Sequence, residues 1–385
     1  MESGKNKEHK HHYNFTTEKL FIGLLALLGI ILIVNAALSY SLNSELRKNT
    51  EALKEKARPA KIEIALIKNS NCRDCSDSAQ LVKYIKSASV NITKETSLEF
   101  NSKEAKEIIS KYGIQKIPSV VVSGETDKIS LEGMQKRDNA LVLDLATPPY
   151  TNASSGQIVG RVTLYTLTDS GCAKCSNFSL LVSQIKLSGV KIVQEKIVDV
   201  NSDEGRSLVS KYKMDFVPAL ILSKDASAYP IVKQAWPGIG TVEQDGYYIM
   251  RTVSPPYINL TTGKLRGLVG VVYLTDKSCA GCYNVETHRE ILSNPQSFAM
   301  KFDSEKTLDV ADSEGKSLVD KYNITQVPTV ILSSEVGVYP SIAALKQFFS
   351  VEKDGSYIFR KLSVVGTYKD LATNQIVEAK KPAQQ

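Results

Sequence analysis

A chain of 385 residues is too long for one compact core, and at roughly 100–200 residues per domain it predicts two to four domains. Its apolar share of 42% and charged share of 23% are those of an ordinary globular protein and exclude a disordered or fibrous class. The net charge of +7 is spread along the chain, with lysines and acids interleaved, so no basic stripe indicates a nucleic-acid partner.

Residues 21–40 are the first segment that departs from globular composition, because none of these twenty residues is charged. A helix of twenty residues is about 30 Å long, which matches the hydrocarbon thickness of a bilayer. We therefore predict a transmembrane helix over residues 21–40, in contact with membrane lipid. A buried core helix would carry a polar face, and a cleaved signal peptide usually has a shorter apolar region of about 7–15 residues. The length favours an uncleaved signal-anchor.

The two flanks of this segment carry nearly equal positive charge, so the positive-inside rule does not decide its orientation. An anchor at the start of a chain, with a large part behind it, usually has a short cytoplasmic tail. We therefore predict a cytoplasmic tail over residues 1–20 and a single-pass protein of the cell membrane whose C-terminal domains are extracytoplasmic. Residues 41–58 are charged and contain spaced leucines, which predicts a helical stalk after the span.

The rest of the chain repeats one pattern three times. Each copy contains a Cys-x-x-Cys (CxxC) pair, and the six cysteines are Cys72 and Cys75, Cys172 and Cys175, and Cys279 and Cys282. Each copy also has an apolar residue before a proline, at Ile117 and Pro118, Val217 and Pro218, and Val327 and Pro328. The leading cysteine precedes this proline by 46, 46 and 49 positions (118 − 72, 218 − 172 and 328 − 279). Because unrelated domains would not agree so closely, we predict three tandem copies of one domain.

The apolar pattern predicts the same order of elements in every copy. A buried strand precedes each CxxC pair, because residues 61–67, 161–167 and 268–274 are apolar and rich in β-branched side chains. A helix, a second strand (190–198 in the second copy), a second helix ending at a Lys-Tyr pair and a strand after the proline follow. This order predicts an α/β domain with a crossover connection. The Asp-Gly dipeptides at 245–246 and 354–355 predict hairpins.

Two Pro-Pro-Tyr segments, at residues 148–150 and 255–257, mark the predicted boundaries between copies. Consecutive prolines cannot continue a helix or pair inside a sheet, so these segments are typical of linkers. We predict domains over residues 59–147, 157–254 and 265–370, and a flexible tail over residues 371–385.

The buried strand, the CxxC pair at the head of a helix and the Ile/Val-Pro dipeptide more than forty residues later resemble the thioredoxin superfamily. The resemblance covers about residues 59–370 and implies three tandem thioredoxin-like domains, each a mixed central sheet flanked by helices. It implies that Pro118, Pro218 and Pro328 are cis and bind substrate together with Ile117, Val217 and Val327. It also implies that Cys72, Cys172 and Cys279 are catalytic nucleophiles and that Cys75, Cys175 and Cys282 resolve the mixed disulfides.

The chemistry of a CxxC pair at a helix N-terminus has a physical basis. Free backbone N–H groups and the helix dipole place partial positive charge there, which stabilises a thiolate. The second sulfur lies close enough to resolve a mixed disulfide with a client. The partners that this chemistry predicts are client protein thiols or a redox partner.

Three interpretations of the cysteine pairs stay open at this point. The pairs are centres of a thiol–disulfide oxidoreductase or isomerase, fixed disulfides in a redox-inert scaffold or binding module, or metal ligands. A Zn²⁺ site requires four ligands and each copy supplies two, so we assign no metal site. All six cysteines belong to local pairs, which favours local chemistry over long-range stapling. The sequence has no phosphate-binding glycine loop, so we predict neither a nucleotide partner nor a cofactor.

Overall fold

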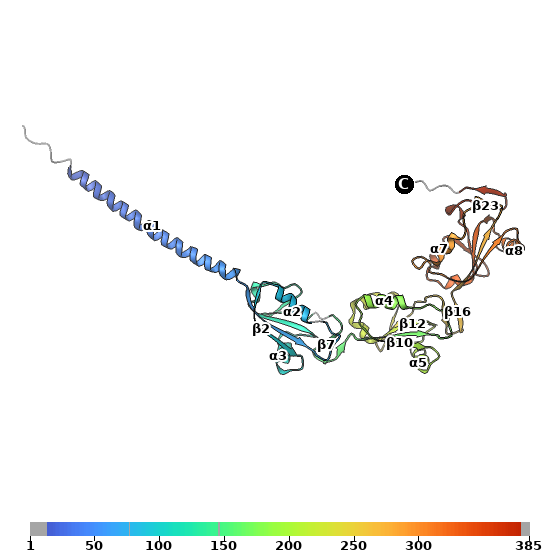
Figure 1. Cartoon of the computed structure of the whole chain (residues 1–385), viewed down its shortest axis with the longest axis horizontal. Coiled ribbons are helices and arrows are strands. Elements are labelled where there is room, and N and C mark those ends of the chain that lie inside the picture. Colours follow the sequence, from blue (N-terminus) through green and yellow to red (C-terminus); the bar gives the residue numbers. More distant parts are fainter. Residues whose placement is uncertain (1–13, 77, 145–146, 379–385) are drawn as a thin grey trace, which may run out of the picture. The chain divides into compact units, whose positions relative to one another are not determined.

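The computed structural model describes residues 14–76, 78–144 and 147–378 (Figure 1). Part of the predicted cytoplasmic tail (residues 1–13) and the end of the predicted flexible tail (residues 379–385) lie outside the described residues. The chain forms two compact units, one of residues 1–70 and 77–145 and one of residues 71–76 and 146–385. The predicted domain boundaries stay predictions.

The predicted span and stalk form one unbroken helix, α1 (Asn14–Ala57), which Figure 1 shows in blue. Its most apolar stretch has a mean hydropathy of 2.7, and none of that stretch is buried. The helix is therefore long and apolar enough to cross a membrane. Its exposure within the described chain contradicts the alternative of a buried core helix, whereas a signal sequence would show the same properties.

The first unit contains a mixed five-stranded sheet of order β2-β1-β4-β6-β5, in which β1 and β2 are parallel and the other neighbours antiparallel. Its elements after α1 are β1 (Ala60–Lys68), α2 (Ser78–Ser87), β2 (Val90–Glu99), α3 (Lys103–Tyr112), β3 (Lys116–Ile117), β4 (Ser119–Gly124), a 3-10 turn (Thr126–Lys128), β5 (Gln135–Arg137) and β6 (Ala140–Leu143). The parallel pair β1 and β2, joined through α2, is the predicted crossover.

The second unit contains two further five-stranded sheets of the same design, so the threefold repeat extends from sequence to topology. Their orders are β10-β9-β12-β14-β13 and β18-β17-β20-β22-β21. The second repeat consists of β9 (Val162–Thr168), α4 (Ser179–Leu187), β10 (Ile192–Asp199), α5 (Asp203–Tyr212), β11 (Phe216–Val217), β12 (Ala219–Leu222), a 3-10 turn (Lys224–Ala228), α6 (Pro230–Ala235), a 3-10 turn (Trp236–Gly238), β13 (Gly240–Val242) and β14 (Tyr248–Met250).

The third repeat has the same order of strands and α-helices, but α7 and α9 are shorter than α4 and α6, and the last 3-10 turn follows the sheet instead of preceding its final hairpin. They are β17 (Leu268–Thr275), α7 (Thr287–Ser293), β18 (Lys301–Asp309), α8 (Ser313–Tyr322), β19 (Gln326–Val327), β20 (Thr329–Leu332), a 3-10 turn (Ser334–Val338), α9 (Ile342–Leu345), β21 (Phe349–Val351), β22 (Tyr357–Phe359) and a 3-10 turn (Leu362–Val364). The hairpins predicted at the two Asp-Gly dipeptides are present, between β13 and β14 and between β21 and β22.

The Pro-Pro-Tyr segments differ from the prediction because they are not simple linkers. Each is followed by a short antiparallel hairpin, β7 (Tyr150–Asn152) with β8 (Ile158–Val159) and β15 (Tyr257–Asn259) with β16 (Lys264–Arg266). The third repeat ends in a similar hairpin of β23 (Tyr368–Asp370) and β24 (Gln375–Val377). The prolines themselves do not pair, but the residues directly after them do.

Local sequence explains the second helix of each repeat. The Ser102 and Ser202 side chains accept hydrogen bonds from the N–H groups of Ala105 and Gly205, and so cap α3 and α5. The residue after the Lys-Tyr pair is left-handed in all three copies, at Gly113, Lys213 and Asn323, which ends each helix. The strand after each proline is buried on both faces, so it forms the centre of its sheet.

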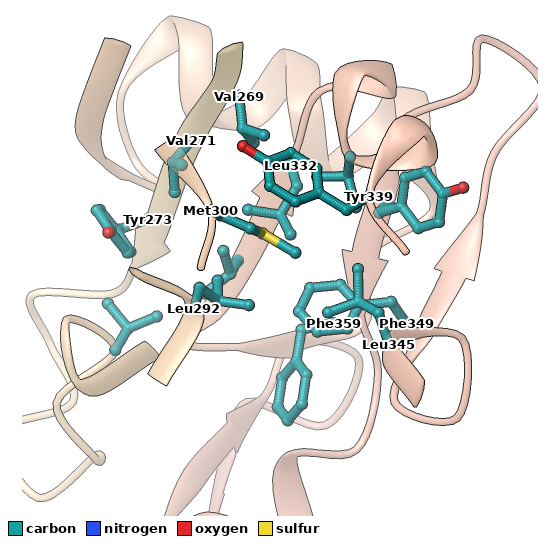
Figure 2. Close-up of a cluster of buried hydrophobic side chains, with 14 of the residues drawn as sticks. Val269, Val271, Tyr273, Leu292, Met300, Leu332, Tyr339, Leu345, Phe349 and Phe359 are labelled. Atoms are coloured by element: carbon teal, nitrogen blue, oxygen red, sulfur yellow. The ribbon is translucent and has the colours of Figure 1, made fainter. Parts of the chain in front are cut away.

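Each repeat has its own hydrophobic core beside its sheet. Figure 2 shows that of the third repeat, where side chains of β17 meet Leu292 of α7 and the rings of Phe349 and Phe359. These two rings pack edge to face with centroids 5.3 Å apart. This core holds the sheet in place, and the cysteine loop of the repeat directly follows strand β17 of that sheet.

Candidate functional site

The six cysteines form three disulfides, each within its own CxxC pair. Each pair occupies a tight turn, because the backbone N–H of the second cysteine donates to the carbonyl of the first at 3.4, 3.3 and 3.2 Å. The turns follow the ends of β1, β9 and β17, as the sequence predicts.

The pairs do not lie at the heads of helices, which corrects the prediction. Helices α2, α4 and α7 begin three, four and five positions after the second cysteine (78 − 75, 179 − 175 and 287 − 282). In the second and third repeats, the Asn177 and Asn284 side chains accept from backbone N–H groups two residues on and so turn the chain before the helix. Because a helix dipole acts mainly within the first turn, it does not provide the expected stabilisation of a thiolate at the leading cysteines.

Burial distinguishes the sulfurs within a pair. Cys72 and Cys279 are each only 7% exposed, whereas Cys75 and Cys282 are half-buried. In the second pair, both cysteines are half-buried. The nucleophilic role of the leading cysteines stays a prediction, and in the first and third pairs the second cysteine is the more accessible one.

The bonds before Pro118, Pro218 and Pro328 are cis, and so are the bonds between the prolines of the two Pro-Pro segments. Ile117, Val217 and Val327 are fully buried. In the third repeat, the structure brings the predicted residues together, because the Sγ atom of Cys282 lies 3.9 Å from the carbonyl oxygen of Val327. The substrate-binding role of these positions stays a prediction.

Two short segments cover the backbone before the cis prolines, and we call residues 255–259 and 366–370 the straps. Strand β15 of the first strap pairs with β11, and β23 of the second pairs with β19, so the backbones of Val217 and Val327 already have strand partners. The straps also hold the cysteine loops. Ser176 donates its N–H to Pro256 at 2.8 Å and its hydroxyl to Pro255 at 2.7 Å, and the N–H of Tyr283 donates to Thr367 at 2.9 Å.

A charged cluster surrounds the first pair. One carboxylate oxygen of Asp74 lies 3.9 Å from Cys72 Sγ. The guanidinium of Arg161 donates through Nε to both Asp74 oxygens at 3.1 Å, and its Nη2 atom lies 4.0 Å from Cys72 Sγ. These hydrogen bonds from Arg161 hold the pKa of the Asp74 carboxyl below its usual range. Sequence reasoning missed Arg161 because it lies in the second repeat and no local pattern links it to Cys72.

The other two pairs have different neighbours. Lys174, inside the second pair, forms an exposed ion pair with Asp303 at 2.6 Å, which is worth little to stability. In the third repeat, the hydroxyl of Tyr283 donates to the Pro328 carbonyl at 3.0 Å and lies 3.3 Å from Nε2 of His288. Burial raises the pKa of Tyr283 and lowers the pKa of His288 to about 4. Tyr283 therefore contacts the cis proline directly, and His288 packs against Tyr283 in an apolar setting.

A metal centre finds no support in the part of the chain that the structure describes. No group of three or more histidine, cysteine, aspartate or glutamate side chains there could hold an ion. His288 is enclosed by aromatic rings, with the Phe359 ring centroid 4.5 Å away.

The strand order, the crossover, the CxxC turn after the first strand and the cis proline before the third major strand together decide the fold. Each repeat has a thioredoxin-like fold. The sequence matches no family model. A comparison with curated proteins finds no match either.

Among solved structures, the chain is similar to an N-terminal domain of the alkylhydroperoxide reductase AhpF from Enterococcus faecalis, with 18% identity, a TM-score of 0.15 and coverage of 46% of this chain and 89% of that one. A protein disulfide oxidoreductase from Aeropyrum pernix has 18% identity, a TM-score of 0.14 and coverage of 46% and 81%. Human ERp44 has 11% identity, a TM-score of 0.13 and coverage of 78% and 88%. At these low scores, the fold assignment rests on the topology and the cis prolines of the chain itself.

Proposed function

We propose that this protein is a membrane-anchored thiol–disulfide oxidoreductase or isomerase that acts on exported proteins through its CxxC pairs. The observation that carries the proposal is the contact in the third repeat between Cys282 Sγ and the Val327 carbonyl, 3.9 Å apart, beside the cis Pro328. It joins the two features that the sequence repeats three times. Helix α1 is the proposed anchor, with the three repeats on the extracytoplasmic side.

The reaction exchanges one disulfide for another. A client thiolate attacks one sulfur of a pair, and a client–protein disulfide forms as the Cys–Cys bond breaks. The electron pair of the broken bond goes to the departing cysteine sulfur, which takes a proton from water. A second client thiolate then displaces the remaining cysteine, so that the client dithiol becomes a disulfide and the pair becomes two thiols. The reverse sequence reduces a client disulfide.

A redox-inert scaffold or binding module is the second candidate function, and two observations favour it. The straps pair with the backbone before two of the cis prolines, and Cys72 and Cys279 are buried. In that case the disulfides only hold the cysteine loops in shape. The two functions differ in whether a pair forms a covalent bond with another protein.

The second repeat is the best place to test this difference, because both of its cysteines are half-buried. Full-length protein with Cys175→Ala leaves Cys172 without its resolving partner. We expect client proteins to accumulate in mixed disulfides on Cys172 when cells are acid-quenched and alkylated. The control carries both Cys172→Ala and Cys175→Ala and should trap none. If single-cysteine variants of all three pairs trap no protein, the oxidoreductase proposal is wrong and the scaffold is favoured.

A further inference from the structure

The first cysteine pair lies beside a cation from the second repeat. Arg161 stands directly before β9, yet its guanidinium is bonded to Asp74 inside the CxxC turn and lies 4.0 Å from Cys72 Sγ. The Asp74 side chain is 19% exposed and that of Arg161 36%, so water screens this contact less than an ordinary surface ion pair. The cluster is therefore placed to influence the charge on the Cys72 sulfur.

Asp74 alone would oppose the opening of the disulfide. Its carboxylate lies 3.9 Å from Cys72 Sγ, and a negative charge at this distance disfavours a thiolate. Arg161 has the opposite effect, because it neutralises the carboxylate and presents its own Nη2 to the same sulfur. Two further ionisable groups interact with Asp74, namely Lys191, ahead of β10, and Tyr229, whose ring is buried.

Arg58 and Arg266 each lie two positions before the first strand of their repeat, one position further out than Arg161, and they have different partners. Arg58 and Arg266 pair with Glu125 and Glu335, the acids that follow the strand after the proline. In the second repeat, the corresponding acid, Asp225, accepts from the backbone N–H of Gly160 at 3.1 Å, as Glu335 does from Gly267 at 2.7 Å, but Arg161 is bonded to Asp74 instead of to this acid. Arg161 thus differs from Arg58 and Arg266 in both position and partner, and its own position brings its charge to a cysteine pair.

We propose that Arg161 is a positioning residue for the first pair. It keeps the Asp74 carboxylate in an ion pair and stabilises negative charge on the Cys72 sulfur when the disulfide opens. A client thiolate attacks the more accessible Cys75, a client–Cys75 disulfide forms, and the electron pair of the broken bond stays on Cys72 Sγ. A leaving thiolate of lower basicity departs faster. This inference rests on the proposed function, and it makes Cys72 the leaving group of the first pair.

The test is the pH dependence of Cys72 alkylation in the full-length, reduced protein. Trypsin cleaves after Arg73 and so places Cys72 and Cys75 on separate peptides, which lets mass spectrometry follow each rate with iodoacetamide. We expect Arg161→Gln to raise the pKa of Cys72 by about one unit, a roughly tenfold loss of thiolate below that pKa. Asp74→Asn should lower it by a similar amount, and Arg161→Lys should keep it near the parent value.

The opposite signs separate electrostatics from structure, because Arg161→Gln and Asp74→Asn break the same ion pair. Arg266→Gln is the matched control, since Arg266 is paired with Glu335 rather than placed at a sulfur, and it should leave the pKa of Cys72 unchanged. Shifts of the same sign in both variants, or no shift in either, would overturn the inference. Expected shifts without trapped clients would defeat the proposed function while the electrostatic role of Arg161 stands.

Discussion

Removal of the second disulfide should weaken the second repeat only modestly. The bond closes a loop of four residues, Cys172 to Cys175. In the chain-entropy model, such a short loop contributes about 2 kcal/mol to the free energy of unfolding. The core of the repeat does not depend on the bond, because its buried cluster is built from residues of β9, α4, β12, α6 and β14 and the segments between them. We therefore expect protein with Cys172→Ser and Cys175→Ser to fold and to be destabilised by about 2 kcal/mol.

Trp236 provides the assay because it is the only tryptophan of the chain. Its ring is 3% exposed and packs edge to face on Tyr248 in the core of the second repeat, with centroids 5.6 Å apart. Its fluorescence therefore reports the unfolding of that repeat. With a urea dependence of about 1–3 kcal/mol per molar, the midpoint should fall by roughly 1 M.

The matched control replaces Cys279 and Cys282 with serine in the third repeat, which has no tryptophan. This change should leave the Trp236 transition where it is. If the Trp236 fluorescence instead shows that the second repeat is unfolded even without urea after loss of this disulfide, the bond is required for folding. The reasoning that the pairs are placed for chemistry would then be refuted for this repeat.

Three further predictions concern the helices and the membrane. A Cβ atom at Gly205 would lie 2.0 Å from the Asp199 carbonyl oxygen. Gly205→Ala should therefore lower the free energy of unfolding reported by Trp236 by about 1–3 kcal/mol, despite the better helix propensity of alanine, whereas Gly315→Ala in the third repeat should leave the Trp236 transition unchanged. Burial lowers the pKa of His288 from 6.5 to about 4. Between these two pH values the unfolded chain binds a proton that the folded chain does not. The folded state is therefore most stable above pH 6.5 and loses stability as the pH falls toward 4. The second repeat has a leucine, Leu181, at the position that corresponds to His288. His288→Leu should therefore remove this loss of stability, as measured by hydrogen-exchange protection of α7 at pH 7 and pH 5. Deletion of residues 1–40 should move the protein from the membrane fraction to the soluble fraction, and its presence in the membrane fraction after deletion would contradict the anchor.

Local patterns explain what could be predicted from the sequence. The ends of α3, α5 and α8 at their Lys-Tyr pairs and the central strands after the prolines follow from apolar spacing and β-branched residues close together in the chain. The Asp-Gly hairpins follow from turn chemistry, since Gly246 and Gly355 adopt positive φ angles of 84°.

Contacts between distant residues explain what could not be predicted. Helices α4 and α7 start late after their CxxC pairs because Ser176 and Tyr283 are bonded to straps about eighty residues further along the chain. Strand β11 has only two residues and its partner β15 only three, too few to show an alternating pattern. The position of Arg161 beside Cys72 depends on the second repeat being folded, and no sequence spacing contains that information.

The reduction potential of each pair, measured in the full-length protein, tests the central claim most directly. The protein is equilibrated with glutathione or dithiothreitol buffers, thiols are labelled, and mass spectrometry gives the reduced fraction of every pair. The account predicts that at least one pair is partly reduced between about −300 and −120 mV, the range of exchange-active dithiols. Three pairs that stay fully oxidised against millimolar dithiothreitol would contradict it.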